Sequence, residues 1–553
     1  MDKNSLFAFL LIAIILIFTP KYMEMVSPTP PQTIEQPGID STDLSEFKKT
    51  EPILESSNFL DTIETHTDLP QHPEQKITIE TDLYDAVVSS RGGGSFLSFS
   101  FKNYFDHDSQ QVDLINGTNK ENLSIWYKNL DGDAVHLNNN WRMSGFRGGL
   151  VSREEILVFT TELSSGKTIS KTLTFYPDSY IIDINIDTKS ASDQFFSGVY
   201  SLGWKGGLTT TEKNIKDDLV YFKSYVFQGG ELEDMKVKKG DVESTSFNGA
   251  TDWVAIRTKY FITAFIPEKA NQVASASIGG NYNEREAYNM ELSLPASSPS
   301  RTSLYLGPLE YERIKNVDRE LDRVMNFGIW PVVYISKAIL WTLKKLHEFI
   351  PNYGYILIIF AFAVKILVYP LTKKSYQSTA AMQKIQPEIA ALKEKYKNNA
   401  QKLNQATMQM YKEKGVNPLG GCLPMLLQMP LLFALFVVFR TTIELRAEPF
   451  IFWIKDLSAP DAVYTLPFSI PIYGEHVAIL PVLMVVSMFI QQRMMSGGAA
   501  QQPQQKTMQY FMTGFFFLMF NSFPSGLNLY YTLFNVLTIA QQKLIPPEVP
   551  VST

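Results

Sequence analysis

The sequence ILIIFAFAVKILVYPL occupies residues Ile356–Leu371 and indicates which class of protein this chain belongs to. It is an apolar run of membrane-spanning length that contains one charged residue, Lys365. A cation within hydrocarbon costs about 3 kcal/mol on insertion scales, so it normally faces protein or a water-filled cavity. Alternatively, Lys365 lies about five residues (8 Å along a helix) from Pro370, and its ammonium can reach the membrane surface. The residue alone does not separate these two explanations.

Composition divides the chain into a mostly polar part, residues 20–325, and a part dominated by apolar runs, residues 326–545. The net charge of −6 over 553 residues is not typical of a nucleic-acid-binding protein, so we expect no direct nucleic-acid partner. Cys422 is the only cysteine, which excludes an intrachain disulfide and a cysteine cluster for a metal. We predict no metal site and no cofactor.

The N-terminal residues are predicted to anchor the chain in a membrane. Residues 1–20 contain a short apolar run that is not followed by a small-x-small cleavage site, which favours an uncleaved transmembrane anchor. Residues 21–75 are rich in proline, threonine, serine and acidic residues, so we expect a disordered linker.

Residues 76–325 are predicted to form a β-sandwich. In YIIDINIDT, the residues Ile182, Ile184 and Ile186 alternate with polar residues, as in a half-buried strand. Many such short strands without long helices between them indicate a large antiparallel sandwich. His107 and His136 with a nearby acid could form an acid–base pair in a sugar-binding sandwich, although scattered surface histidines are the preferred explanation.

Residues 326–351 are predicted to form an amphipathic helix that lies in the membrane interface. Between Trp330 and Ile350, apolar residues recur at spacings of three and four, and lysines fall on the opposite face. A surface helix of the sandwich would show the same pattern, but the position directly before a span favours the membrane.

Five apolar runs follow, and each is predicted to cross the membrane: about 353–371, 421–441, 477–493, 508–523 and 525–543. Residues 372–416 are predicted to form a helical hairpin. The stretch 372–420 carries nine lysines and three glutamates, a net charge of +6, which places the hairpin in the cytoplasm by the positive-inside rule. With the N-terminal anchor this gives six spans, cytoplasmic termini, an outer sandwich and a short tail at 546–553.

Polar residues recur in the last span at helical offsets of three, four and seven, on one face: Asn528, Tyr531, Thr532 and Asn535. Gln428 lies inside the third span and Lys365 inside the second. In lipid these groups must meet one another, as in a dry bundle, or water, as in a groove or pore. The polar face and the lysine together favour a cavity.

Four motifs occur in order over about 200 residues: VYPLT at 368–372, NPLGGCLPMLLQMP at 417–430, ELRAEPFIFWIKDLSAPD at 444–461 and FPSGLNLYY at 523–531. Together they closely resemble the YidC family of membrane protein insertases in its Gram-negative form. SSRGGGSFLSF at 89–99 and DWVAIRTKYFITAFIPE at 252–268 resemble the periplasmic domain of that family.

This resemblance implies an α-helical polytopic protein of the bacterial inner membrane with six transmembrane helices. Five of them form an insertase core at 352–545, and a large periplasmic all-β supersandwich domain of the galactose-mutarotase kind precedes it. The implied activity is non-enzymatic: a positively charged groove receives nascent membrane proteins, alone or beside the Sec translocon, where the insertase acts as a chaperone. The ribosome, signal-recognition targeting factors and the phospholipid bilayer are the other implied partners.

The resemblance also implies which residues act. The groove would contain Lys365, Gln428, Asn528, Tyr531, Thr532 and Asn535, and the hairpin would dock incoming chains through lysines such as Lys384, Lys393, Lys395, Lys402 and Lys412. Lys365 stands where the family usually has arginine, which keeps the charge but loses the planar fork of donors. Ala361 replaces a polar groove residue, and the chain end IPPEVPVST lacks the basic tail of some members.

Two other functions fit parts of the sequence. A transporter or channel would move a small solute past Lys365, and vesicle flux would reveal it. A membrane-tethered sugar-binding sandwich would be stabilised by its ligand. The motifs cluster in the spans and hairpin, so neither alternative is favoured.

Overall fold

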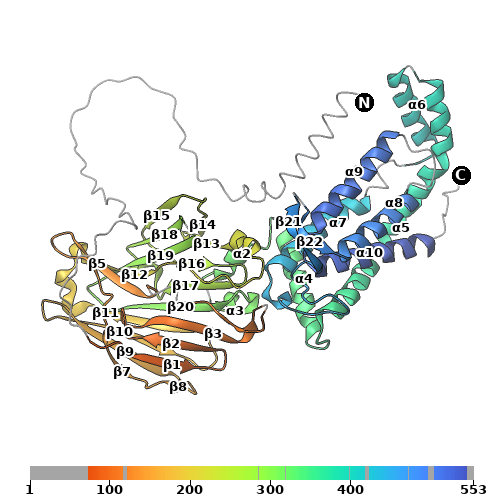
Figure 1. Ribbon diagram of the computed structural model, residues 1–553. Helices are drawn as coiled ribbons and strands as arrows, with labels where there is room; N and C mark the ends of the chain where they lie inside the picture. Colours follow the sequence, from red (N-terminus) through yellow and green to blue (C-terminus); the bar gives the residue numbers. More distant parts are fainter. Residues whose placement is uncertain are drawn as a thin grey trace, which may run out of the picture.

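A computed structural model of the chain describes residues 72–106, 108–115, 121–283, 285–317, 319–397, 399–416, 423–470, 473–495 and 503–544. Its N-terminal part is a β domain and its C-terminal part is a group of helices. The arm that ends in α6 (Ala400–Glu413) lies farthest from the β domain (Figure 1). The predicted anchor at 1–20, most of the linker, His107, Cys422 and the tail at 546–553 lie outside the described residues.

Three sheets build the β domain. The first has the order β4 (Gln111–Asp113), β3 (Ser95–Phe105), β2 (Tyr84–Ser89), β1 (Lys76–Glu80) and β8 (Gly149–Leu150). The second has the order β14 (Glu231–Met235), β13 (Lys223–Gln228), β16 (Trp253–Arg257), β17 (Phe261–Pro267), β20 (Ser300–Pro308), β11 (Ile181–Asp187), β10 (Thr168–Phe175), β9 (Glu155–Glu162) and β7 (Arg142–Gly145). The third has the order β15 (Val242–Asn248), β18 (Ser275–Tyr282), β19 (Glu286–Pro295), β12 (Val199–Trp204), β5 (Ser124–Lys128) and β6 (Ala134–His136).

Apolar alternation explains how the strands pack. In β11 the residues Ile182, Ile184 and Ile186 are buried while their neighbours are half-buried, so the predicted half-buried strand is confirmed. Strand β11 pairs antiparallel with β10 and β20, and one hydrophobic core joins residues of all three sheets. The only parallel pairing among the described strands is that of β1 with β8. His136 lies in β6, where its ring stacks on Trp126.

The glycine-rich turn at 92–94 surrounds a buried cation. Gly94 has a φ of +107°, and a Cβ there would lie 2.8 Å from the Phe159 ring, so only glycine fits. Lys171 of β10 is fully buried and its Nζ donates to the carbonyl oxygens of Gly92 (2.8 Å) and Leu123 (2.7 Å). Burial lowers the pKa of Lys171 to about 7, because the desolvated ammonium is disfavoured.

The C-terminal part consists mainly of helices: α4 (Val332–His347), α5 (Tyr353–Lys395), α6 (Ala400–Glu413), α7 (Leu423–Thr441), α8 (Leu480–Met495), α9 (Pro503–Phe520) and α10 (Ser525–Leu544). The short helices of the described chain are η1 (Lys189–Gln194), η2 (Phe196–Gly198), α2 (Ile215–Tyr221), η3 (Ala270–Gln272), α3 (Tyr311–Lys315), η4 (Leu321–Met325) and η5 (Ile443–Leu445). A two-stranded sheet, β21 (Ala462–Ile470) with β22 (Gly474–Ala478), precedes α8 and has no counterpart in the sequence predictions.

Helix α5 runs without a break through the predicted end of the first core span at residue 371. It is 43 residues long, or roughly 65 Å at 1.5 Å per residue, and it contains Pro370 and Pro387. Its N-terminus is capped by Asn352, whose side chain accepts from the amides of Gly354 and Tyr355. The first arm of the hairpin is therefore a direct extension of this helix, and α6 is the second arm.

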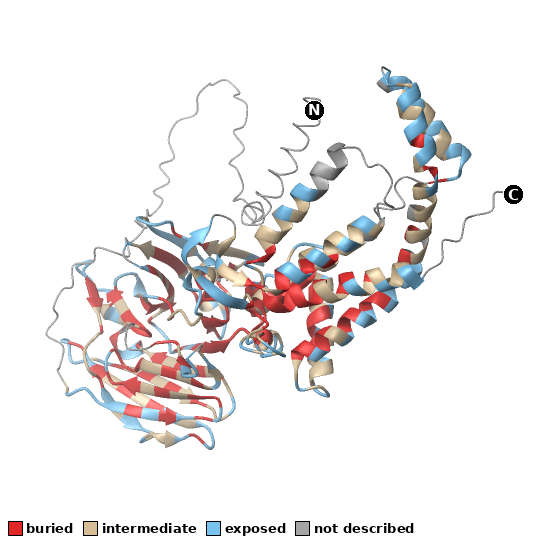
Figure 2. Ribbon diagram, turned by 45° about the vertical axis from the view of Figure 1, so that its right-hand side comes forward, coloured by how far each residue is buried: buried red, intermediate tan, exposed pale blue. Residues whose placement is uncertain are grey.

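One helical segment among the described residues, Tyr353–Pro370, is long and apolar enough to cross a membrane. Shorter apolar helical stretches occur at Gln428–Thr441, Leu480–Met494 and Tyr510–Phe520. The six spans remain a prediction. Figure 2 shows buried residues concentrated in the part of the helical group nearest the β domain, whereas the arm ending in α6 consists mostly of intermediate and exposed residues.

Helix α4 packs its predicted apolar face against other helices. Val332, Ile339 and Leu343 are buried in the core that includes α5, α7 and α10. Trp330 and Trp341 are exposed instead, as expected for aromatic side chains at a headgroup layer. The position of α4 in a membrane interface stays a prediction.

Ion pairs join the β domain to the helical part. Asp217 of α2 contacts both Lys259 (2.7 Å) and Arg440 at the end of α7. Arg446, a few residues after Arg440 in the chain, forms a second ion pair with Glu212 (2.7 Å from Nε). Burial acts to raise the pKa of Asp217, but the charges of Lys259 and Arg440 outweigh it and hold the pKa below its usual value. The carboxylate of Asp217 is therefore ionised and bridges the two parts.

Candidate functional site

Lys365 lies on the inner face of α5. Ala361 and Val364 on the same side are buried, and Lys365 itself is only 8% exposed. Ile366 and Leu367 point outward and are 74% and 77% exposed. The lysine is thus held among helices rather than extended along the outer surface.

The ammonium of Lys365 contacts α10 through two residues. Its Nζ donates a 2.6 Å hydrogen bond to the Thr538 hydroxyl and lies 4.0 Å from the centre of the Phe534 ring. Thr538 in turn donates to the Phe534 carbonyl (2.6 Å). Among the described residues no carboxylate forms an ion pair with Lys365, so a hydroxyl and an aromatic face stabilise the charge.

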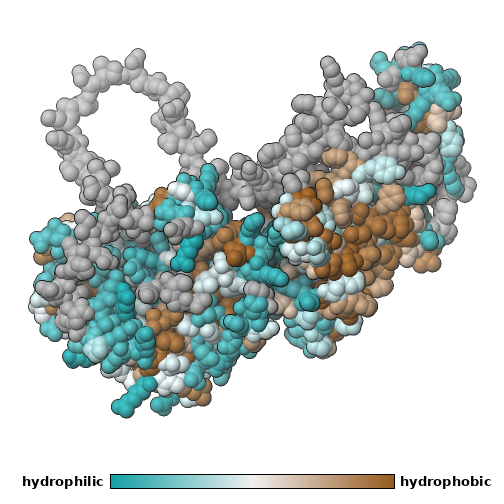
Figure 3. Space-filling view, in the orientation of Figure 1, coloured by the Kyte–Doolittle hydropathy of each residue, from teal (hydrophilic) through white to brown (hydrophobic). Residues whose placement is uncertain are grey.

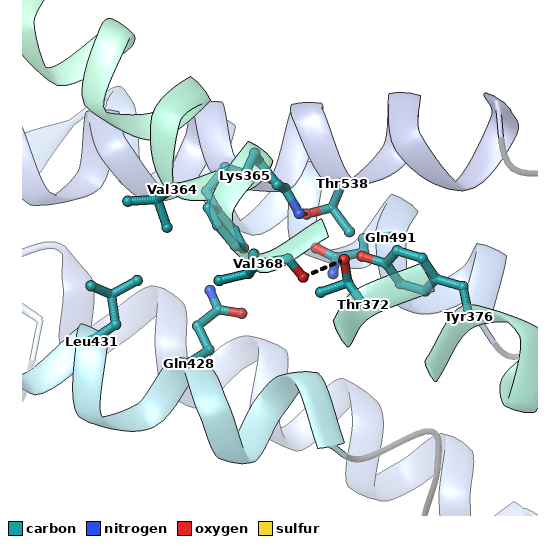
Figure 4. A pocket seen from close by; sticks show the side chains of 10 residues that line it. Val364, Lys365, Val368, Thr372, Tyr376, Gln428, Leu431, Gln491 and Thr538 are labelled. Carbon is teal, nitrogen blue, oxygen red and sulfur yellow. Dashed lines mark hydrogen bonds between the residues drawn. The ribbon is translucent and has the colours of Figure 1, made fainter. Parts of the chain in front are cut away.

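A pocket of about 50 Å³ adjoins this ammonium. Its walls come from α5, α7, α8 and α10, and they consist of Val364, Lys365, Val368, Thr372, Tyr376, Gln428, Leu431, Gln491, Phe534 and Thr538. Figure 4 shows the Lys365 amine beside Thr538 and the Gln428 side chain reaching in from α7. Thr372 donates to the Val368 carbonyl (3.1 Å) and accepts from Gln541 (3.2 Å). One cation and several uncharged polar groups therefore face a small space between apolar helices.

The pocket contains two of the six groove residues predicted from sequence, Lys365 and Gln428. The other four lie elsewhere on α10. Asn528 donates to the carbonyls of Phe520 (3.1 Å) and Phe523 (3.4 Å), which ties α10 to the turn after α9. Asn535 donates to the Ser487 hydroxyl of α8 (3.2 Å).

Tyr531 and Thr532 also lie away from the pocket lining. Tyr531 is buried with its ring against Phe520 and Tyr530. The Thr532 hydroxyl donates to the Asn528 carbonyl within its own helix (2.8 Å). Asn528, Tyr531 and Asn535 therefore contact α8 or the end of α9, whereas the Thr532 bond stays within α10.

Sequence reasoning missed Thr538, Thr372, Tyr376 and Gln491. Thr538 lies three residues after Asn535, so extending the helical offsets by one step would have included it. Gln491 and Tyr376 gave no such signal, because only packing brings α8 and the extension of α5 to the same pocket.

The predicted docking lysines lie on the hairpin of α5 and α6. Lys384, Lys395, Lys402 and Lys412 are exposed, and Lys393 is half-buried. A small apolar core of Ile385, Ile389 and Val416 holds the arms together, and Lys414 pairs with Glu388 across them (2.9 Å). The hairpin therefore presents a basic surface. No cluster of three or more potential metal ligands occurs in the part of the chain that the structure describes.

Comparisons with known proteins cover both parts of the chain. The family model of the 60Kd inner membrane protein matches residues 345–550, and that of the YidC periplasmic domain matches residues 76–342. The membrane protein insertase YidC of Chlorobaculum parvum is 34% identical, over 99% of this chain and 94% of that protein. The same insertase of Chlorobium luteolum is 35% identical, over 98% and 94%. The solved structure of an active YidC insertase is 17% identical and covers 86% of this chain and 94% of its own, with a TM-score of 0.36.

Proposed function

Because this chain belongs to the YidC family of membrane protein insertases, we propose that it inserts nascent inner-membrane proteins through the pocket around Lys365. The observation that carries the proposal is a buried ammonium without a carboxylate partner, beside a polar pocket between apolar helices. Such a charge is available to an anionic group that enters the pocket.

The energetics of insertion explain why a cation is useful there. On insertion scales an aspartate at the centre of a span costs about 3 kcal/mol, whereas a leucine contributes about −0.5 kcal/mol. The cost of moving one acidic residue of a substrate into the membrane therefore cancels the favourable insertion energy of about six leucines. Lys365 would lower the cost of the carboxylate while the segment is part-way across. The apolar helix of the substrate then moves into lipid, and its burial drives the process.

The proposed topology has six spans with both termini in the cytoplasm. The family match places the β domain in the periplasm, and the positive-inside rule places the basic hairpin on the opposite side. Helices α5, α7, α8, α9 and α10 would be the five core spans, and residues 1–20 the sixth. In Figure 1 the basic hairpin and the β domain lie at opposite ends of the helical group, as this topology requires.

The exposed lysines of the hairpin are proposed to dock incoming chains and the machinery that brings them. A ribosome surface and targeting factors rich in nucleic acid are anionic, so a basic hairpin attracts them over about a Debye length. The proposal extends to the Sec translocon as a partner, with this chain acting beside it as a chaperone.

Reconstitution tests the proposal directly. Proteoliposomes that contain this chain as their only protein should protect a single-span substrate from added protease several-fold more than empty liposomes do. A folded chain that gives no more protection than empty liposomes would contradict the insertase function. Flux of small solutes without insertion would indicate a transporter instead.

A further inference from the structure

The two-stranded sheet of β21 and β22 exposes apolar side chains where the helical part faces the β domain (Figure 1). Strand β21 reads AVYTLPFSI and contains no charged residue. Tyr464 and Phe468 are 62% and 61% exposed, and Val463 and Ile470 are exposed as well. We call these two strands, Ala462–Ile470 and Gly474–Ala478, the apolar hairpin.

Both faces of β21 are uncovered. Successive side chains of a strand point to opposite faces, so a strand that packs against protein on one face alternates between buried and exposed residues. Eight of the nine residues of β21 are exposed, and only Leu466 is half-buried. The adjacent residues Phe468 and Ser469 therefore both face outward, on opposite sides of the sheet. A single protein partner would cover one side only.

The base of the apolar hairpin is fixed to the helices. The Asp461 carboxylate accepts from the amides of Ile479 (3.0 Å) and Leu480 (2.8 Å) at the start of α8, and from the Trp453 indole (2.9 Å). Asn521, just after α9, donates to the Tyr473 carbonyl (3.0 Å) at the turn of the hairpin. The exposed side chains of the hairpin are therefore held next to the N-terminus of α8.

The apolar surface continues from the hairpin onto α8. Val482, Leu483, Val486 and Ile490 of α8 are exposed. Figure 3 shows a broad hydrophobic surface over the helices. Phe452, next to the Trp453 that Asp461 holds, is 84% exposed at a φ of +61°, a conformation that a bulky residue rarely adopts. A medium that covers the apolar surface of α8 would therefore also cover Phe452 and the apolar hairpin.

We propose that the apolar hairpin lies in the headgroup layer of the bilayer on the β-domain side, with phospholipid as its ligand. A medium that surrounds the sheet accounts for the exposure of both faces. Tyrosine suits the headgroup level, and phenylalanine suits the acyl-chain side of the same boundary. The outer edges of a two-stranded sheet carry unpaired backbone groups, so the hairpin stays at the depth where water reaches them. Fixed at its base, it sets the depth at which α8 enters the membrane.

Fluorescence quenching tests the proposal in the full-length chain. In a Cys422→Ser background, which lacks other cysteines, Phe468→Cys and Ser469→Cys are labelled with bimane and reconstituted into phosphatidylethanolamine–phosphatidylglycerol nanodiscs. Lipids brominated near the headgroup should quench both labels at least half as strongly as a label at Val486→Cys on α8. Iodide should quench both several-fold less than a label at Leu150→Cys, which is 61% exposed on β8.

Three results would overturn the proposal. If iodide quenches the labels at both positions as strongly as it quenches the Leu150→Cys label, the hairpin lies in water. A label quenched by lipid at only one of the two positions would indicate a partner on one face. Labels shielded from both quenchers would indicate that protein covers the hairpin. If the Phe468→Cys chain does not fold, Tyr464→Cys, which is also 62% exposed on β21, replaces it beside Ser469→Cys.

Discussion

The Lys365 ammonium of α5 donates to the Thr538 hydroxyl of α10 over 2.6 Å, although the two residues are separated by 173 positions in the chain. The hydroxyl has two roles, because it accepts from the lysine and donates to the Phe534 carbonyl. This geometry orients the cation at the pocket, and it makes Thr538 a positioning residue for Lys365.

Replacing Thr538 by valine keeps the side-chain shape and removes the acceptor of Lys365. A buried donor without its partner costs about 1–3 kcal/mol, and more when the donor is charged, so the ammonium should move from its present place. We expect insertion of substrates with an acidic leading segment to fall several-fold in reconstituted vesicles.

The matched control is Thr532→Val, because within the described part of the chain the Thr532 hydroxyl bonds to the Asn528 carbonyl one turn earlier and to no other helix. Insertion should stay close to that of the unmodified chain. Equal losses in the two valine variants would show that the Thr538 contact has no special role.

Lys365 is expected to act through its charge. Lys365→Met should impair insertion of substrates with acidic leading segments at least several-fold more than insertion of uncharged ones. Lys365→Arg keeps the cation and should retain most of the activity. An arginine variant without activity, or a methionine variant that impairs both substrate classes equally, would argue against a point charge.

Asp217 is expected to hold the β domain to the helices. In Asp217→Asn, Lys259 and Arg440 lose their common carboxylate. Breaking a buried pair typically costs 3–5 kcal/mol, and since Asp217 is partly exposed we expect about 2–3 kcal/mol, measured by denaturation in detergent. The exposed pair of Lys167 with Asp193 is the control, and Asp193→Asn should not change stability measurably.

The same carboxylate predicts a dependence on pH. The folded-state pKa of Asp217 lies below its ordinary value, so its contribution to stability is complete above about pH 4 and is lost as the pH falls through the lower folded value. The stability difference between the unmodified chain and Asp217→Asn should therefore shrink in acid. A difference that stays constant down to pH 2.5 would contradict this role.

Lys171 predicts a rise in stability with pH in the β domain as well, but over a higher pH range than Asp217. The unfolded chain holds a proton there up to about pH 10.4, whereas the folded protein releases it near pH 7. Unfolding takes up a proton between these values, so the free energy of unfolding should rise with pH over that range. Lys171→Met should lose this rise and exposed Lys189→Met should keep it; identical pH profiles for the two variants would contradict the prediction.

The sequence predicted local structure better than it predicted contacts. The alternation of Ile182, Ile184 and Ile186 identified a real strand, because a half-buried strand requires that pattern. The run expected at 525–543 corresponds to α10 at Ser525–Leu544. Apolar run length and helical period are local properties, so both could be recognised without knowledge of neighbours.

Contacts between elements could not be predicted in this way. The offsets within α10 placed Asn528 and Asn535 on one face, but they did not reveal that Asn535 bonds to α8 or that Thr538 meets Lys365. The continuity of α5 past Pro370 was equally hidden, since a proline in a helix removes one hydrogen bond that packing can compensate. Both features depend on how helices pack.

The central claim is that a substrate occupies the pocket beside Lys365, and photocrosslinking from Gln428 tests it most directly. A photoreactive residue at 428 should crosslink strongly to a ribosome-stalled single-span protein, with the crosslinks following its leading and apolar segments as the chain lengthens. The control position is Leu367, which is 77% exposed on the outer face of α5 and should give weaker crosslinks to the leading polar segment. Crosslinks from 367 but not from 428, with the chain folded and the substrate targeted, would contradict the account.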